Sequence, residues 1–161
     1  MNPCVNLLLA ATLAGLPAAA AAATARVEFE KPESYTDAGR PRQDATREDT
    51  LDKLRDHFVR EIARRLPAGE TLTLWITDVD LAGDFEPTQH YYNEVRIVKE
   101  RYPPRIELRF RLARADGSTI KEGRRTLRDT AFLLHGSLDR QDALRYEKTM
   151  IDRWLEAEFR R

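Results

Sequence analysis

Four acidic residues stand close together in the middle of the chain: Asp78, Asp80, Asp84 and Glu86. Carboxylates at this spacing are typical of a calcium loop, and Gly83 falls where such a loop bends. The pattern departs from such a loop in three ways: Ala82 offers no oxygen ligand, Gln89 stands in place of a bidentate glutamate, and a strand rather than a helix precedes it. Three arginines follow in the same stretch: Arg96, Arg101 and Arg105. The interpretation that fits better is that these acids pair with the arginines or face solvent.

The same acids are also candidates for general acid and base. A hydrolase of the glycosidase type uses two carboxylates on either side of the bond that it cleaves. Here the pair would be Asp78 or Asp80 together with Glu86. The sequence contains nothing that sets the distance between them or raises the pKa of either one. A carboxylate-dependent hydrolase is therefore kept as an alternative.

Other catalytic centres are not indicated by the residue pattern. The chain has no Gly-x-Ser-x-Gly motif, which would mark a nucleophilic serine. The three histidines are His57, His90 and His135, and none of them has the spacing of a zinc site. We therefore predict no catalytic residue, no metal and no cofactor.

Aromatic residues offer a second kind of candidate site. Tyr91 and Tyr92 lie in the same stretch as the acids, and Trp75 lies on the strand before them. Clustered exposed aromatics mark interaction sites, so these three predict a platform for a peptide or a glycan. The competing interpretation is that the rings fold back and cover the sheet. Both remain open, and Arg96 is added to the candidate binding residues.

The hydropathy pattern predicts the elements that position these residues. Alternating apolar residues indicate strands at 26–30, 71–81, 105–113 and 118–127. Apolar residues three or four apart predict two amphipathic helices, one from Asp44 or Thr46 to Leu66 and one from Asp139 to Phe159. A long connector, 82–104, separates the second and third strands. The expected fold is α+β, a mostly antiparallel sheet of three to five strands in the order β-α-β-connector-β-β-α.

Two expectations about strand faces follow from strict alternation. In the strand at 71–81, Asp78 and Asp80 continue the face that begins with Leu72, so they should lie where this face opens to solvent. The Asp116-Gly117 pair predicts a hairpin. A three-residue turn with Gly117 as the bulge would place Ile120 opposite Leu112, joining apolar to apolar.

The N-terminal segment has the features of a secretory signal peptide. Residues 1–25 contain no charged side chain, and a largely apolar run from Val5 to Leu16 precedes an alanine tract. The run is shorter than the ~20 residues that span a bilayer. We expect cleavage after Ala25 or Ala23, which leaves one domain, 26–161, in the periplasm or outside the cell. No stable membrane span is expected after cleavage.

Charge and cysteine content restrict the partners of the mature domain. The chain carries 27 basic and 27 acidic residues, a net charge of zero. This balance argues against a nucleic-acid partner and against a polybasic membrane patch. Its single cysteine, Cys4, lies in the leader, so the mature domain contains no cysteine and no disulfide.

Several longer stretches resemble a bacterial family. They read VEFEKPESYTDAG, DVDLAGDFEP, YPPRIELRF, LRDTAFL and LRYEKTMIDRW, and they are spread over nearly the whole predicted domain. The chain resembles the family catalogued as domain of unknown function 3016. This resemblance implies a small exported protein of one domain. It implies no activity, ligand or catalytic residue.

The sequence thus favours an exported, non-enzymatic domain that binds a partner through the stretch 78–104. An envelope protein or a peptide is the expected partner. Two alternatives stay open. One is the hydrolase described above, and the other is a structural accessory subunit of an envelope complex, whose amphipathic helices complete the core of a partner.

Overall fold

The structure is a computed structural model that describes residues 22–39, 44–86, 95–135 and 141–160. Its fold is α+β, as predicted. The elements are β1 (Thr24–Phe29), η1 (Pro32–Ser34), α1 (Asp44–Arg65), β2 (Thr71–Asp80), β3 (Arg105–Ala113), β4 (Thr119–Arg128), α2 (Phe132–His135) and α3 (Arg145–Phe159). α3 begins later than the expected start near Asp139, because the chain before it forms a turn in which Asp142 accepts the N–H of Leu144 at 2.9 Å.

The four strands form one sheet in the order β1-β2-β3-β4. β1 and β2 are parallel, whereas β2–β3 and β3–β4 are antiparallel. The sheet is therefore mixed, and the expectation of a mostly antiparallel sheet is corrected in this respect. The reason is α1, which connects β1 to β2 and carries the chain back along the sheet, so that β2 runs in the same direction as its neighbour.

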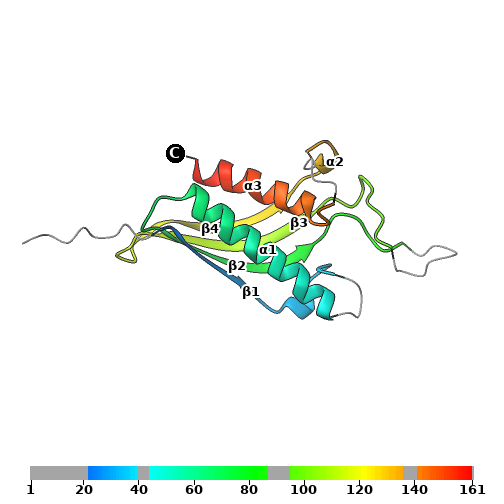
Figure 1. Cartoon of the computed structure of the whole chain (residues 1–161), viewed down its shortest axis with the longest axis horizontal. Helices are drawn as coiled ribbons and strands as arrows, with labels where there is room; N and C mark the ends of the chain where they lie inside the picture. The colour runs from blue at the N-terminus through cyan, green and yellow to red at the C-terminus, as the bar shows by residue number, and fades with distance from the viewer. Residues whose placement is uncertain (1–21, 40–43, 87–94, 136–140, 161) are drawn as a thin grey trace, which may run out of the picture.

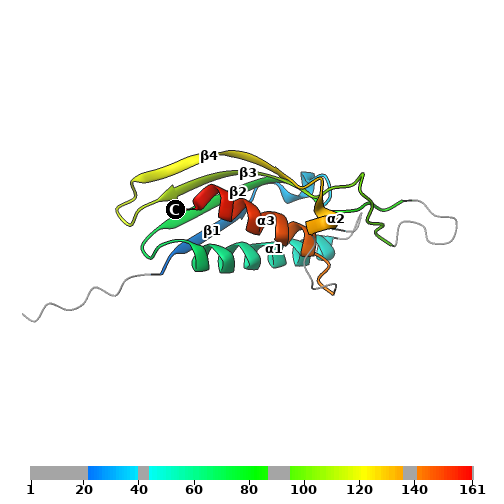
Figure 2. The same cartoon turned by 90° about the horizontal axis from the view of Figure 1, so that it is seen from above.

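Both long helices cover the same face of the sheet (Figures 1 and 2). Their apolar stripes meet the strands in one core that includes Phe58 of α1, Ile151 of α3 and Leu74 of β2, all with no exposed surface. Phe110 of β3 packs edge-to-face against Trp154 of α3, with ring centroids 5.9 Å apart. The two predicted amphipathic helices are thus confirmed, and their stripes are buried by the chain's own sheet.

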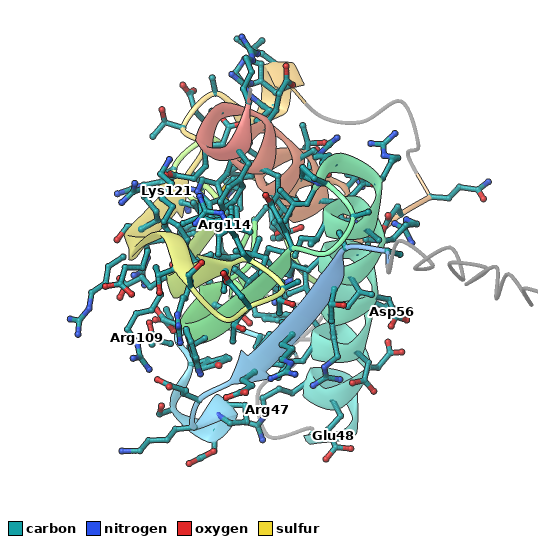
Figure 3. All side chains as sticks on the ribbon, turned by 90° about the vertical axis from the view of Figure 1, so that its left-hand side faces the viewer. Arg47, Glu48, Asp56, Arg109, Arg114 and Lys121 are labelled. Atoms are coloured by element: carbon teal, nitrogen blue, oxygen red, sulfur yellow. The ribbon has the colours of Figure 1, made fainter. Side chains whose placement is uncertain are left out.

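The opposite face of the sheet, which we call the open face, is polar. Its residues along β3 are Glu107, Arg109 and Arg111, which alternate with the buried Ile106, Leu108 and Phe110. Figure 3 shows Arg109 on this side, away from α1, whose Asp56 and Glu48 project into solvent. One layer of helices on one layer of sheet therefore leaves a charged surface of four strands.

β2 contains a bulge that changes which residues reach the open face. The register with β3 shifts between Ile76 and Asp78, so that Thr77 is an extra residue. The carbonyl of Ile76 accepts the N–H of Glu30 at 2.9 Å and the hydroxyl of Tyr35 at 2.7 Å. Because of this extra residue, Val79 returns to the core opposite Ile106.

The bulge overturns the expectation for the two aspartates of β2. Asp78 lies opposite Glu107, and Asp80 lies opposite Arg105. Both aspartates therefore belong to the open face and do not continue the Leu72 face. A single bulged residue reverses the alternation of every side chain that follows it.

The β3–β4 hairpin has the predicted three-residue turn. Arg114 donates its N–H to the carbonyl of Ser118 at 2.9 Å, and Gly117 has a φ of 83°, the left-handed conformation that favours glycine. A second register shift follows directly, and Lys121 comes to lie opposite Leu112. The expected pairing of Ile120 with Leu112 is therefore wrong, because Ile120 is itself the bulged residue.

Within the described ranges, no helix combines the length and the apolar composition that a membrane crossing requires.

The bulge in β2 predicts an unusual tolerance to deletion. Removing Thr77 should leave a regular strand with the same residues in the core, because Thr77 has no partner of its own on β3. Removing Thr73, which is paired with Arg111, should turn half of the strand's apolar residues toward solvent. We expect the first deletion to cost about 1–3 kcal/mol and the second to prevent folding. Urea denaturation followed by circular dichroism measures both, and equal losses would contradict the bulge.

Candidate functional site

A cavity lies where β2 and β3 meet the connector, and we call it the strand-end cavity. It has a volume of about 330 Å³. One row of paired residues crosses it, with Asp80 of β2 opposite Arg105 of β3 and Arg105 opposite Arg128 of β4. The charged residues that line it are Asp37, Asp80, Asp84, Arg101, Arg105 and Arg128. Two of the predicted site residues, Asp80 and Asp84, therefore reach one cavity.

Asp78 is a structural residue at the edge of this site. Its carboxylate accepts the N–H of Thr36 at 2.7 Å and the hydroxyl of Thr36 at 2.8 Å. It also accepts a hydrogen bond from Nη2 of Arg105 at 2.7 Å. These three bonds hold the loop after β1 against β2 and β3 and leave Asp78 little capacity for a ligand.

Asp80 has one cationic partner among the described residues, and the contact is long. Asp84 has no ion pair within the described ranges, and its Oδ1 accepts the N–H of Phe85 at 2.7 Å. Oδ2 of Asp80 lies 3.6 Å from Nε of Arg105, and a third of the Asp80 side chain is exposed. Burial raises the pKa of Asp80, and the negative charges of Asp37 and Asp78 raise it further, while Arg105 acts in the opposite direction. Asp80 therefore has capacity left to receive a cationic group.

Arg96, a predicted binding residue, anchors the connector. Its Nη1 and Nη2 donate to the two carboxylate oxygens of Asp37 at 2.6 and 2.9 Å, and Nη1 also donates to the carbonyl of Gly83 at 3.1 Å. The guanidinium lies 4.5 Å from the ring centroid of Phe85. Gly83 has a φ of 86°, and a Cβ there would come within 2.8 Å of the carbonyl oxygen of Ile97. This packing leaves room only for glycine.

Asp37 is a site residue that sequence reasoning missed. It stands in a polar loop with no motif around it, and its two partners lie far along the chain. Its N–H and carbonyl bond to Val79 and Leu81, and its carboxylate binds Arg96. The only available signal was its place in one of the stretches that resemble the family.

Asp84 and Glu86 have local roles. The backbone of Asp84 exchanges two hydrogen bonds with Ile97, at 3.0 and 2.8 Å, and these bonds anchor the connector. Glu86 pairs with Lys99 at 2.5 Å, accepts the hydroxyl of Tyr102 at 3.0 Å and contacts Arg101. Its hydrogen bonds with Lys99, Tyr102 and Arg101 lower the pKa of Glu86 to about 2. Glu86 is therefore ionised at any ordinary pH.

The predicted acids thus do not form one constellation. Asp80 and Asp84 line the cavity, Asp78 and Arg96 hold its walls, and Glu86 pairs with cations of the connector. Tyr91 and Tyr92 lie outside the described residues. Trp75 lies on the open face beneath Arg109, whose guanidinium is 5.4 Å from its ring centroid.

A second polar cluster joins the two long helices. His57 and Glu61 of α1 and Asp152 of α3 each bring one potential metal-ligating atom within 4.8 Å of the others. Nε2 of His57 lies 2.9 Å from Asp152, and Nδ1 lies 2.9 Å from Nη2 of Arg60. Since an arginine only donates, Nδ1 accepts and Nε2 donates its proton to Asp152.

The acids of this cluster are already paired with arginines. Glu61 contacts both Arg64 and Arg65, and Arg65 also reaches Asp152 at 3.5 Å. A metal ion would have to displace these bonds and reverse the tautomer of His57. The cluster is best described as an ion-pair network that holds α1 to α3. Sequence reasoning missed it because its members lie on two helices far apart in the chain.

Glu147 of α3 is the most deeply buried acid of the described chain. It is 1 % exposed, and its Oε1 accepts the N–H of Ala82 at 2.7 Å, which fixes the first residue of the connector. Its Oε2 has no hydrogen-bond partner among the described residues. Burial raises the pKa of Glu147. The sequence signal was visible, since a glutamate stands on an otherwise apolar helical stripe.

Glu147 should therefore make the stability depend on pH. The pKa of Glu147 is higher in the folded than in the unfolded protein. The protonated carboxyl therefore contributes its full stability only below the unfolded pKa. This contribution is lost as the pH rises from the unfolded pKa toward the folded pKa. Glu147→Gln keeps an acceptor for Ala82 and removes the ionisation. We expect the free energy of unfolding of this variant, minus that of the wild type, to rise with pH by up to about 1.4 kcal/mol per unit.

The measurement is urea denaturation between pH 4 and 8. Glu156→Gln is the matched control, because Glu156 is exposed on the same helix and, among the described residues, its side chain bonds only Arg160. A difference that stays flat across this range would show that Glu147 ionises as freely in the folded state as in the unfolded one.

Residues 23–157 match the family described as protein of unknown function (DUF3016). A search of curated proteins found no match to the chain.

Proposed function

The chain belongs to the DUF3016 family of proteins of unknown function, and we propose that it is an exported binding module for an extended peptide. One observation carries the proposal. Asp80 and Arg128 line the same cavity and carry opposite charges. Within the described ranges, the only ion pair of Asp80 is its 3.6 Å contact with Arg105, and Arg128 has no ion pair.

The spacing of these two charges suggests the size of the ligand. Asp80 and Arg128 lie on either side of Arg105, two strands apart in the sheet. Neighbouring strands are ~4.8 Å apart, so the two positions are separated by about 10 Å. An extended tripeptide spans about the same distance, at ~3.3–3.6 Å per residue. An ammonium group would meet Asp80, and a carboxylate would meet Arg128.

The hydrolase alternative has less support. It needs Glu86 as the partner of Asp78 or Asp80, but Glu86 is not among the residues that line the strand-end cavity. Its pKa of about 2 makes it a weak base and prevents it from acting as an acid near neutral pH. Asp78 is committed to Thr36 and Arg105.

The accessory-subunit alternative loses its original motivation. It rested on two amphipathic helices in need of a partner's core. Phe58 has no exposed surface and Trp154 is 8 % exposed within this chain. Neither stripe needs another protein for its burial.

Export follows from the leader, and the fold favours one of the two cleavage sites. Thr24 and Ala25 are the first residues of β1 and pair with Thr71 and Leu72. Cleavage after Ala25 would remove both pairs, whereas cleavage after Ala23 would leave β1 complete. The proposed mature protein therefore begins at Thr24 and acts in the periplasm or outside the cell.

Binding is tested with tri-alanine that has free termini, in isothermal titration calorimetry. We expect the wild type to bind it and to bind the acetylated, amidated form at least tenfold more weakly. Asp80→Asn and Arg128→Gln should each cost about 1.5–3 kcal/mol, since each removes a hydrogen bond to a charged group. Asp56→Asn on α1 and Arg114→Gln in the hairpin are the controls. Equal binding of the capped and free peptides would refute the site.

Export is tested by expressing the full chain in a Gram-negative host. Intact-mass analysis of the protein released from the periplasm should show an N-terminus at Thr24. Full-length protein confined to the cytoplasm would contradict export. A mature form beginning at Arg26 would contradict the argument from β1, and its β1 pairing would be expected to be weaker.

A further inference from the structure

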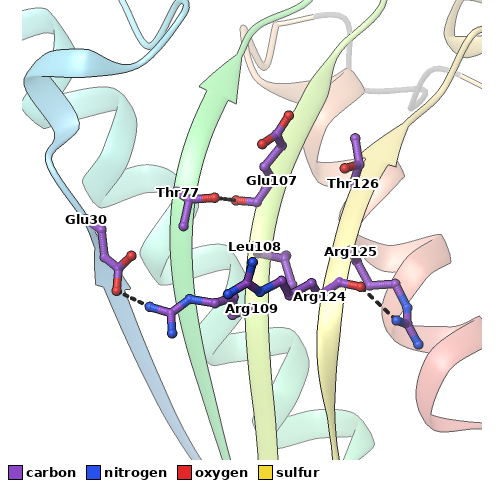
Figure 4. A pocket seen from close by; sticks show the side chains of 8 residues that line it. All are labelled: Glu30, Thr77, Glu107, Leu108, Arg109, Arg124, Arg125 and Thr126. Carbon is purple, nitrogen blue, oxygen red and sulfur yellow. Dashed lines mark hydrogen bonds and ion pairs between the residues drawn. The ribbon is translucent and has the colours of Figure 1, made fainter.

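The centre of the open face is hollowed by a groove of about 520 Å³, which we call the open-face groove (Figure 4). Its polar lining comes from β2, β3, β4 and the residue that directly follows β1: Glu30, Thr77, Glu107, Arg109, Arg124, Arg125 and Thr126. It shares no lining residue with the strand-end cavity. Its volume lies in the ~300–1,000 Å³ range of small-molecule sites.

Arg109 and Glu107 of this groove each form an ion pair. Arg109 makes an ion pair with Glu30 and stacks on Trp75. Glu107 makes an ion pair with Arg105, its neighbour on β3. Arg124 has neither an ion pair nor a side-chain hydrogen bond within the part of the chain that the structure describes. The groove therefore contains one unneutralised positive charge.

The position of Arg124 makes this charge costly. It lies directly opposite Arg109 across β3 and β4, and like charges in this relation destabilise a sheet. In Figure 4 its side chain reaches from β4 across β3 toward Arg109, while Arg109 points away from it toward Glu30. The other two arginine and lysine side chains of this part of β4, Lys121 and Arg125, are instead paired with Glu158 of α3. Arg124 is thus held over the groove without a partner.

The chemistry of the groove selects the kind of anion. A guanidinium presents a planar fork that matches the two oxygens of a carboxylate. The hydroxyl group of Thr126 lies on the same floor and can donate to it, whereas the hydroxyl of Thr77 already donates to the carbonyl of Glu107 at 3.3 Å. Glu30 and Glu107 border the site, so a phosphate or a polyanion, with its additional negative charge, would meet two carboxylates.

We propose that the open-face groove binds a ligand through a single carboxylate, which Arg124 holds beside the hydroxyl of Thr126. The ligand is a glutamate side chain of a peptide, which brings one negative charge. This inference does not rest on the strand-end cavity, because the two sites use different residues. Occupation would also relieve the repulsion between Arg124 and Arg109.

The test is a titration followed by two-dimensional ¹H–¹⁵N NMR of the mature chain. The probes are N-acetyl-glutamate amide, its glutamine analogue, succinate and inorganic phosphate. We expect the glutamate probe to shift the amide signals of Thr77, Glu107, Arg124 and Thr126, and the glutamine analogue to bind at least tenfold more weakly. Stronger binding of the glutamate probe than of succinate supports a peptide ligand. Succinate carries two carboxylates, so the reverse order would contradict a site for a single carboxylate.

Arg124→Gln should weaken binding at least tenfold while leaving the fold intact. Since it removes a like-charge pair, the melting temperature of the free protein should stay the same or rise by about 1 °C. Arg153→Gln, on the helical layer, is the matched control and should bind like the wild type. Asp80→Asn should also bind like the wild type, so a failure of this proposal is distinct from a failure at the strand-end cavity.

Three further results would overturn the proposal. These are the absence of signal shifts with both carboxylate probes, equal binding by Arg124→Gln and the wild type, and tighter binding of phosphate than of either carboxylate.

Discussion

The structure depends on the extra residue in β2. Side chains of a strand alternate between its two faces, so an apolar core face can be maintained past Ile76 only if the alternation is reset. The bulge at Thr77 performs this reset. It keeps Val79 in the core opposite Ile106, and it brings Asp78 and Asp80 onto the open face. The Ile76 carbonyl is satisfied by Glu30 and Tyr35, so the loop after β1 is fixed at the same point.

The polar contacts beside the strand-end cavity depend on this fixed loop. With the loop held at Tyr35, Thr36 bonds Asp78, and Asp37 pairs with the backbone of Val79 and Leu81. Asp37 can then receive Arg96 from the connector, and Arg96 covers Phe85. The described ends of the long connector are therefore held by a chain of polar contacts that begins at a bulge. A rigid base of this kind is what a binding loop requires.

The sequence predicted an element correctly wherever its apolar residues recur with one constant spacing. The helical stripes, the strands and the α+β class are confirmed because period 3.6 and period 2 can each be counted along the chain. It misplaced the residues after Thr77 and around Ile120, because one inserted residue changes the face without changing composition. The parallel pairing of β1 was missed for another reason. It depends on which way a helix returns the chain, which hydropathy does not encode.

The candidate site was predictable only in part. The pairing of the acids with nearby arginines is confirmed for Asp78 with Arg105 and for Glu86 with Arg101. Arg96 instead binds Asp37, which lies 59 positions away in the sequence. No local sequence pattern indicates such a pair. The same holds for His57 and Asp152. Contacts between distant segments decide which acids remain available, so composition alone could not single out Asp80.

The chain has a net charge of zero and many charged side chains, and the two sides of the sheet differ in how far these charges are paired. On the helical side, His57, Glu61 and Asp152 are enclosed by arginines, and Glu158 draws Lys121 and Arg125 of β4 toward α3. On the open face the same strand leaves Arg124 and Arg128 without ion pairs among the described residues. Both lie in hollows of the surface. An acid opposite either arginine would add an ion pair to the sheet, and its absence is the feature on which both proposed sites depend.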